Sequence, residues 1–370
     1  MKTLSVYTRS GDVCPSSYYR ILQYAEKLDC KIKYRAGIPN EIFSKYNKTK
    51  GIKRKFYQIK VFSGAYLRII RFFIADIIKK PDVLFVQRAI MLRVFPFPLS
   101  FLMKKMIKNI DNVIWDIDDN IFECGEISNA EKNILLAKSN HIIVIGDYLK
   151  SLIPDEYKDK VTFLPTTDGD YRFENVDKLS IQRKKEYNED RVRFLWLATW
   201  TSLPFLEDIV PYMDRAAKIV KEEYGKEIIL EVVCNRPLLS QTENFKIINY
   251  NWTKELAKEK MFEANVGLMP TRYNPFTLGK GGFKMIQYMS VGLPTLASAV
   301  GYTNEVMVDG ETGISISYEN LEEWEKAIVE ICSSWGKMDS MGRKARKRWE
   351  AAFSYDENLN KLYKLINEKN

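Results

Sequence analysis

The stretch "LGKGGFKMIQYMSVGLPTLAS", residues 278–298, places glycines and lysines directly before a short amphipathic pattern and a buried strand. In a helix that starts near Lys280, the side chains of Lys280, Lys284 and Gln287 share one face. A helix N-terminus carries about half a positive charge and several unpaired N–H groups, and glycines let a bulky anion approach the backbone. The pattern predicts a diphosphate site; the alternative is that the lysines are merely solvated.

Short apolar runs alternate with helical patterns on both sides of this stretch. The predicted strands are residues 3–8, 83–88, 112–118 and 141–146 in a first series, and 192–199, 228–234, 245–250, 266–270 and 294–298 in a second. Such alternation is typical of parallel sheets covered by helices on both faces. The polar segment 165–191 between the series predicts a linker, and 370 residues suit two domains. An amphipathic helix is expected before residue 28, and the C-terminal helices break near Ser354.

Composition favours a soluble globular protein, because no apolar run could serve as a signal peptide core or a membrane span. We therefore expect a cytoplasmic protein. The five cysteines are scattered and the single histidine, His141, opens a predicted strand, so neither disulfides nor structural zinc are expected. The fingerprints GxGxxG and GxxxxGK[ST] are both absent, which disfavours a dehydrogenase and a P-loop NTPase.

Basic residues are concentrated in the segment 45–80. Asp76 is its only acid, and its basic residues are Lys45, Lys48, Lys50, Lys53, Arg54, Lys55, Lys60, Arg68, Arg71, Lys79 and Lys80. Apolar residues recur there at helical spacing. A basic amphipathic helix of this kind suits an anionic membrane surface, which would place the protein peripherally at the inner face of the cytoplasmic membrane. An ordinary domain helix with solvated lysines is the alternative, and no nucleic acid is expected as a partner.

Beyond residue 287 the chain reads "QYMSVGLPTLASAVGYTNEVMVDGETG". This segment resembles the donor domain of the retaining nucleotide-sugar glycosyltransferases of family four (group 1), of the polysaccharide-assembly type. The match runs through Gly292, Pro294, Ser298, Gly301, Glu305, Gly310 and Gly313. The segments "SGDVCPSSYYRILQYAEKL", "WDIDDNIFE" and "FLWLATWTSLPFLEDIV" also resemble parts of that family, so the resemblance covers nearly the whole chain.

The resemblance implies an α/β chain of the GT-B fold, with two Rossmann-like doubly wound parallel-sheet domains facing across a cleft. Residues 1–170 would form the acceptor-side domain, with the helix of about 350–370 packed back on it. Residues 171–349 would bind the nucleotide-sugar donor. Catalysis is assigned to Asp118, Asp119 and Lys284. The donor-binding residues are Gly279, Lys280, Gly281, Lys284, Gln287, Gly301, Thr303, Asn304 and Glu305, and the acceptor or phosphate side comprises Gly11, Asp12, Ser16 and Ser17.

The carboxylates of the expected site differ from the pattern of the family. Family members carry two glutamates spaced as Gly279 and Gln287 are here, so one carboxylate is missing and an amide replaces the other. Asp116, Asp118 and Asp119 follow a predicted strand, where they could hold sugar hydroxyls, act on the acceptor hydroxyl or cap the next helix. The resemblance implies no metal and no cofactor beyond the nucleoside-diphosphate sugar.

The function implied is transfer of a sugar, as in hexosyltransferases, from a nucleoside diphosphate to a glycan or lipid-linked acceptor with retention. Capsule or exopolysaccharide synthesis is the expected pathway. Two alternatives stay open: a nucleotide-sugar epimerase, and a non-catalytic partner of the same fold that binds a glycan or a nucleotide. The missing carboxylate at Gly279 supports the second alternative.

Overall fold

The structure is a computed structural model that describes residues 1–49 and 51–368, so Lys50 and the last two residues lie outside the described residues. The chain divides into two compact units. Unit 1 comprises Met1–Thr166 and Asp356–Asn370, and unit 2 comprises Thr167–Tyr355.

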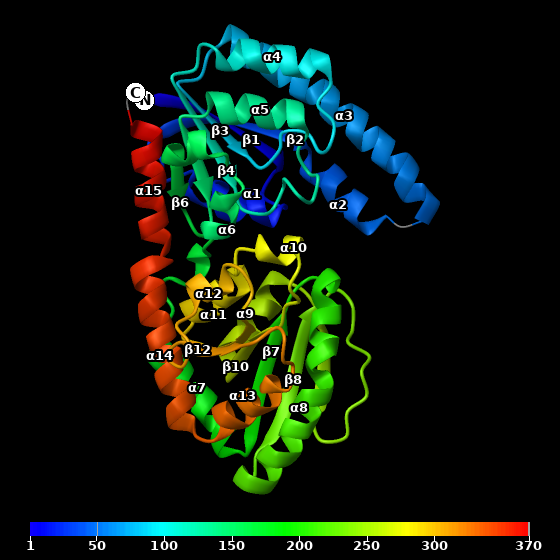
Figure 1. Cartoon of the computed structure of the whole chain (residues 1–370), viewed down its shortest axis with the longest axis vertical. Helices are drawn as coiled ribbons and strands as arrows, with labels where there is room; N and C mark the ends of the chain where they lie inside the picture. Colours follow the sequence, from blue (N-terminus) through cyan, green and yellow to red (C-terminus); the bar gives the residue numbers. More distant parts are fainter. Residues whose placement is uncertain (50, 369–370) are drawn as a thin grey trace. The chain divides into compact units, whose positions relative to one another are not determined.

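Unit 1 is built on a six-stranded parallel sheet with the strand order β2-β1-β3-β4-β5-β6 (Figure 1). The strands are β1 (Lys2–Ser10), β2 (Cys30–Ile38), β3 (Val83–Gln87), β4 (Asn112–Ile117), β5 (His141–Val144) and β6 (Val161–Phe163). The α-helices are α1 (Pro15–Arg20), α2 (Asn40–Lys48), α3 (Gly51–Ile78), α4 (Phe97–Ile107), α5 (Asn129–Lys138), α6 (Asp147–Ser151) and α15 (Tyr355–Asn367). Every residue of β3 and β4 is buried, as expected for strands that are covered on both faces.

The core of unit 1 forms where α3 and α4 pack against the sheet. Ile69 and Phe73 of α3 are completely buried beside Trp115 of β4. The C-terminal helix α15 is fixed to the same unit by polar contacts. The side-chain amide of Asn112 donates to the carbonyl of Leu365 at 2.6 Å.

Unit 2 has a second six-stranded parallel sheet, with the order β12-β11-β10-β7-β8-β9. Its strands are β7 (Arg191–Leu197), β8 (Glu227–Cys234), β9 (Lys246–Asn251), β10 (Val266–Met269), β11 (Thr295–Ser298) and β12 (Gly313–Ile316). Its α-helices are α7 (Val176–Asn188), α8 (Leu203–Tyr224), α9 (Lys254–Glu263), α10 (Pro275–Leu278), α11 (Phe283–Ser290), α12 (Thr303–Val306), α13 (Glu323–Cys332) and α14 (Trp335–Ala352).

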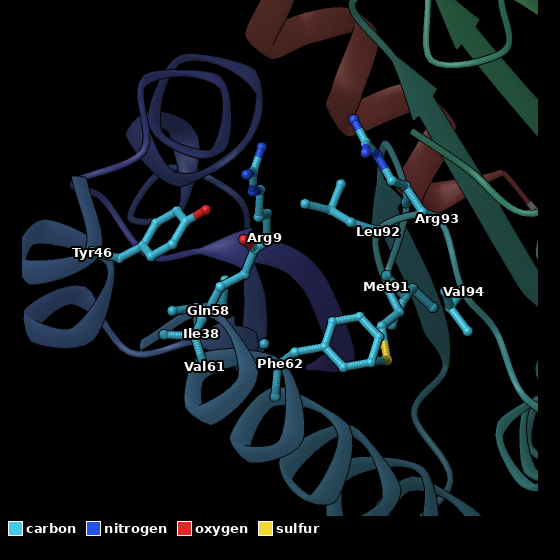
Figure 2. A pocket seen from close by; sticks show the side chains of 14 residues that line it. Arg9, Ile38, Tyr46, Gln58, Val61, Phe62, Met91, Leu92, Arg93 and Val94 are labelled. Atoms are coloured by element: carbon cyan, nitrogen blue, oxygen red, sulfur yellow. The ribbon is translucent and has the colours of Figure 1, made fainter. Parts of the chain in front are cut away.

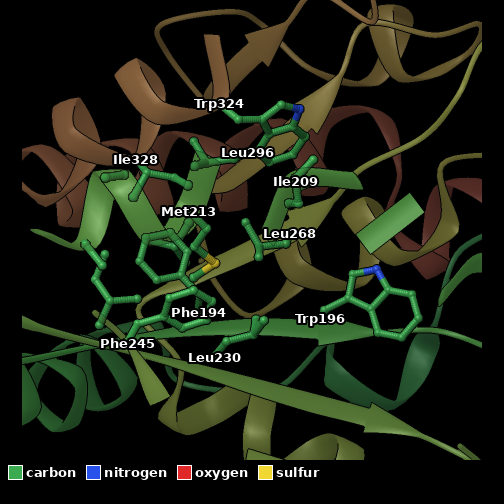
Figure 3. Close-up of a cluster of buried hydrophobic side chains, with 14 of the residues drawn as sticks. Phe194, Trp196, Ile209, Met213, Leu230, Phe245, Leu268, Leu296, Trp324 and Ile328 are labelled. Atoms are coloured by element: carbon green, nitrogen blue, oxygen red, sulfur yellow. The ribbon is translucent and has the colours of Figure 1, made fainter. Parts of the chain in front are cut away.

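The core of unit 2 lies between the sheet and the helices α8 and α13 (Figure 3). Phe194 and Leu268 from the strands meet Met213 of α8, and Trp324 and Ile328 of α13 complete the cluster. Each of these side chains is at most 1% exposed. The chain therefore has two separate cores, one for each sheet, as its length predicts.

The prediction of a linker over residues 165–191 is wrong for much of its length, because α7 forms there and belongs to unit 2. Asn175 caps α7 by accepting a hydrogen bond from the backbone N–H of Lys178. Arg183 is buried and donates to the carbonyls of Met261, Phe262, Val291 and Gly292 at the ends of α9 and α11. Arg183 thus provides hydrogen-bond donors for carbonyl groups at the C-termini of two helices. This polar contact anchors α7 in place of the apolar stripe by which a helix is usually recognised in a sequence.

Three further elements differ from the predictions. The first helix, α1, ends at Arg20 rather than near residue 28. The strand β2 was not predicted, since its alternating lysines and arginine hide an edge strand. The basic segment 45–80 is shared between α2 and α3 rather than forming one helix. In the part of the chain that the structure describes, no helix could cross a membrane.

Candidate functional site

The predicted anion site lies in a pocket of unit 2, at the carboxyl ends of β7 and β10. The pocket has a volume of about 220 Å³. It is lined by Trp196, Leu197, Ala198, Thr199, Ser202, Phe205, Leu268, Met269, Pro270, Thr271, Thr277, Lys280, Gly281, Gly282, Phe283 and Lys284. Ligands of parallel α/β sheets bind at this edge of the sheet. The structure therefore brings Lys280, Gly281 and Lys284 together around one cavity.

The helix at this pocket starts three residues later than predicted. α11 begins at Phe283, and its N-cap residue Gly282 has a left-handed φ of 57°. A side chain at this position would be strained, so glycine determines how the chain enters the helix. Lys280 therefore precedes the helix, and its ammonium lies 3.9 Å from the centre of the Phe276 ring. Lys284 and Gln287 remain on one face of α11.

Lys284 is the central cation of the pocket. Its Nζ donates to Oε1 of Gln287 at 3.0 Å, and Nε2 of Gln287 donates to Oδ2 of Asp168 at 2.7 Å. Burial lowers the pKa of the Lys284 ammonium from 10.5 to about 8, against the opposing effect of the Asp168 charge. A cation that is poorly solvated in the free protein is stabilised strongly when an anion binds beside it. This observation favours an anionic ligand for the pocket.

Asp168 is a residue of the site that the sequence did not reveal. It is buried, and burial raises the pKa of its carboxyl group. Its position within the predicted linker disguised it, since Asp-Gly sequences are common in turns. Gln287 is 4% exposed, and both the oxygen and the nitrogen of its side-chain amide form hydrogen bonds within the protein. The structure thus shows Gln287 linking Lys284 to Asp168, which differs from its expected contact with ribose.

The low pKa of Lys284 predicts a pH-dependent affinity for diphosphates. Only the ammonium form attracts the anion, so the affinity for a nucleoside diphosphate should be constant up to about pH 8 and then fall by up to about tenfold per pH unit. Calorimetric titration above pH 7 avoids the phosphate's own ionisation near pH 6. In the absence of ligand, the pH dependence of stability has the opposite sign. Because the pKa of Lys284 is lower in the folded than in the unfolded state, the stability of the free protein should rise between about pH 8 and 10.5.

The matched variant for this measurement is Lys284→Arg, because a guanidinium stays charged across this pH range. If the affinity of Lys284→Arg for the diphosphate declines with pH as in the wild type, the pH dependence belongs to another group.

The remaining predicted donor residues are not among the residues that line this pocket. Gly279 follows α10 as its C-cap residue. At Gly301, where φ is 57°, an added Cβ would lie 2.5 Å from the carbonyl oxygen of Leu278, so this glycine permits two loops to touch. Thr303 is buried and its hydroxyl donates to backbone carbonyls of its own loop, which differs from the predicted ligand contact. Asn304 and Glu305 are exposed on α12.

The predicted aspartate cluster of unit 1 is divided between two arginines, and among the described residues no helix begins directly after it. Oδ1 of Asp118 accepts from Nε of Arg88 at 2.5 Å and from Nε2 of Gln87 at 3.0 Å. The hydroxyl of Ser16 also donates to this carboxylate. Although burial alone would raise it, the Arg88 guanidinium lowers the pKa of Asp118 to about 2. Asp118 is therefore a permanently charged, weakly basic group, and this geometry suits binding and orientation better than proton abstraction.

Asp119 and Asp116 lie on either side of this contact. Asp119 also bonds to Arg88, at 3.2 Å. Asp116 belongs to β4 and is completely buried, where both of its oxygens accept from Arg20. Arg20 also donates to the carbonyl of Leu164 and to the hydroxyl of Thr166. Asp116 thus has a structural role, and its partner Arg20 was not identified from the sequence.

The predicted acceptor-side residues follow β1. Gly11 and Asp12 line a cavity of about 340 Å³ together with Thr8 and Tyr18. Asp12 is exposed and accepts from the amide of Asn40 at 2.5 Å. Ser17 is completely buried in α1, so only Ser16 of the serine pair joins the polar cluster around Asp118.

His141 opens β5 and is interpreted as structural. Its Nε2 is 3.3 Å from Oε2 of Glu368 on the C-terminal segment. Burial lowers the pKa of the imidazole.

The chain is similar to known glycosyltransferases. Residues 203–334 match the family model described as Glycosyl transferases group 1. No curated protein matches the chain. A solved glycosyltransferase from Rickettsia africae has a TM-score of 0.62 at 14% identity, covering 99% of this chain and 100% of that one. HepE from Anabaena, in complex with UDP and glucose, has a TM-score of 0.62 at 8% identity, with 99% of each chain covered.

TarM from S. aureus is larger than this chain. It has a TM-score of 0.50 at 14% identity, and the likeness covers 77% of this chain and 55% of TarM. These structural likenesses confirm the predicted GT-B fold of two Rossmann-like units. The group 1 domain starts with α8 and ends after α13, so it contains most of the pocket around Lys284.

Proposed function

We propose that this chain, with its group 1 glycosyltransferase domain over residues 203–334, transfers a sugar from a nucleoside diphosphate to a glycan or lipid-linked acceptor. The observation that carries the proposal is the half-buried Lys284, which lines the unit 2 pocket from the N-terminal end of α11 and whose ammonium pKa is lowered by burial. HepE, whose fold is similar, has been solved with UDP-glucose and with UDP.

In the proposed reaction, the bond between the anomeric carbon and the diphosphate oxygen breaks, and the acceptor hydroxyl forms the new bond and passes its proton to the leaving diphosphate oxygen. Negative charge grows on the leaving diphosphate. Lys284 and the backbone N–H groups at the N-terminus of α11 would stabilise that charge. The family resemblance implies retention at the anomeric carbon. Synthesis of capsule, exopolysaccharide or another cell-surface glycan is the pathway we propose.

The donor class can be tested by thermal stabilisation with UDP, GDP, dTDP and CDP. A ligand that binds only the folded state raises the melting temperature, by an amount that grows with its concentration over Kd. We expect one diphosphate to stabilise the protein clearly more than the others, and the matching nucleotide-sugar to be consumed when an acceptor is added. No stabilisation by any of the four would contradict the donor site.

The second candidate is a non-catalytic partner that binds a nucleotide or a glycan. Gly279, where the family carries a glutamate, favours it, and the weakly basic Asp118 adds to this. Diphosphate binding without consumption of any nucleotide-sugar would support this candidate.

We also propose that α3 contacts an anionic membrane from the cytoplasmic side. Its buried residues Ile69 and Phe73 face the core. A separate apolar stripe recurs at helical spacing and is 44–76% exposed: Ile52, Ile59, Leu67, Ile74 and Ile78. Lysines and arginines flank this stripe, as in helices that lie in the headgroup region. The apolar pattern predicted from sequence thus consists of two stripes, and the exposed one supports the membrane proposal.

Flotation with vesicles tests this membrane contact. Each basic residue near an anionic surface contributes about 1 kcal/mol, so the variant Lys53→Gln, Arg54→Gln, Lys55→Gln should lose about 10²-fold in affinity for phosphatidylserine vesicles. Vesicles of uncharged phosphatidylcholine are the control and should bind weakly. Wild-type protein that stays in the soluble fraction with anionic vesicles would eliminate the proposal.

A further inference from the structure

A second cavity, in unit 1, is lined by α3 and by the loop that follows β3. Its volume is about 420 Å³, and it lies at the carboxyl ends of β1 and β2 (Figure 2). Most of its lining is apolar: Val61, Phe62, Ala65, Met91, Leu92 and Val94. None of the residues assigned to the donor or acceptor sites lines this cavity. This cavity is therefore distinct from the donor and acceptor residues assigned above.

Two arginines give this apolar cavity a cationic rim. Arg9 and Arg93 both line it, and Figure 2 shows their guanidinium groups pointing the same way, away from the Val61 and Phe62 floor. Nε of Arg9 is buried without a hydrogen-bond partner. Within residues 1–49 and 51–368, no ion pair involves either guanidinium, and that of Arg9 lies 5.8 Å from the centre of the Phe43 ring. A buried donor left unpaired is costly, so an acceptor group of a ligand would relieve that cost.

The wall that carries Arg93 is preformed. Oε1 of the buried Glu131 accepts from the backbone N–H of Ile90 at 2.5 Å. Nε1 of Trp115 donates to the carbonyl of Arg88 at 2.8 Å and holds the start of the same loop. Arg93 itself has a positive φ of 65°, and its N–H donates to the carbonyl of Glu126. The loop is thus fixed at both ends, as a binding site requires.

The chemistry of the lining selects the class of ligand. An inorganic phosphate would leave most of the apolar lining unused, and a bare sugar would find few polar partners. An amphiphile satisfies both halves of the cavity, with a hydrocarbon chain on the floor and a phosphate at the arginines. α3 contributes both Val61 and Phe62 to the floor and the exposed apolar stripe on another face.

We infer that this cavity binds the lipid phosphate of a lipid-linked acceptor, with the phosphate held by Arg9 and Arg93. The inference rests on the proposed function, and it selects the lipid-linked acceptor from the two classes left open there. The same helix would lie on the membrane and line the cavity, so the hydrocarbon would have a short path from the bilayer to the protein.

Calorimetric titration with dodecyl phosphate, below its micelle concentration, tests the inference on the full chain. We expect saturable binding, with inorganic phosphate and the uncharged dodecyl maltoside each at least tenfold weaker. Arg9→Gln and Arg93→Gln should each weaken dodecyl phosphate about tenfold, since each removes a charge-assisted contact. Ala65→Trp should abolish binding by filling the floor. Arg71→Gln is the matched control, because it removes a charge from the same helix outside the cavity.

The outcomes distinguish a failure of this inference from a failure of the proposed function. Equal binding of dodecyl maltoside, or dodecyl phosphate binding that survives both arginine changes and Ala65→Trp, would overturn the inference. Stabilisation by a nucleoside diphosphate in the same preparation reports on the donor pocket of unit 2 alone. A protein that consumes its donor but binds no dodecyl phosphate would keep the proposed function and lose this inference.

Discussion

Replacing Lys284 by methionine should lower kcat/KM for the nucleotide-sugar by about 10²–10³-fold, and the affinity for the free diphosphate by about 10–10²-fold. The ammonium is poorly solvated and lies beside the first turn of α11, so its charge acts on the leaving group in a medium of low polarity. Methionine keeps the length of the side chain and removes only the charge. Steady-state kinetics and calorimetric titration with the preferred diphosphate would measure both effects.

The stability of the same variant distinguishes a binding defect from a folding defect. Because burial lowers the pKa of Lys284, the charged form is a cost to the free protein, and Lys284→Met should melt at or above the wild-type temperature. Lys218→Met, on the exposed face of α8, is the matched control and should change neither binding nor stability. A Lys284→Met protein with wild-type diphosphate affinity would remove the lysine from the donor site.

The two parallel sheets could be predicted from the sequence because most of their strands are short apolar runs. Fully buried strands such as β3 and β4 show this pattern most clearly. The edge strand β2 was missed because it is half-exposed and carries charged residues at alternate positions. Helix α7 was missed for a related reason. It is anchored by the hydrogen bonds of the buried Arg183, whereas most helices are anchored by a stripe of apolar side chains that can be recognised in the sequence.

The candidate site could be predicted where its residues are close together in the sequence. Glycines and lysines before α11 identified the pocket correctly, because they are neighbours in sequence. Asp168 could not be found in this way, since it lies far along the chain from Gln287, which it contacts. The aspartates after β4 were identified as a cluster, but only the fold shows that Arg20 and Arg88 divide them between two partners.

The pair of Arg20 and Asp116 should have the largest effect on stability. Both side chains are completely buried, and Arg20 joins α1 to β4 and to the segment after β6. Removing one partner leaves the other charge buried and unpaired, so Arg20→Met should destabilise unit 1 by about 3–5 kcal/mol. Urea unfolding, with hydrogen exchange of β4 amides to assign the transition to unit 1, would measure the loss. Lys80→Met, which breaks the exposed pair with Asp111, should change stability by less than about 1 kcal/mol.

The double variant Arg20→Met, Asp116→Leu shows whether the loss comes from the stranded charge or from the missing contacts. If the unpaired carboxylate dominates, the double variant should be more stable than Arg20→Met alone, because no charge is left buried. The recovery should remain incomplete, since the carbonyl of Leu164 and the hydroxyl of Thr166 also lose their donor. If the double variant loses as much unfolding free energy as the two single variants together, Arg20 acts through these backbone and hydroxyl contacts, independently of Asp116.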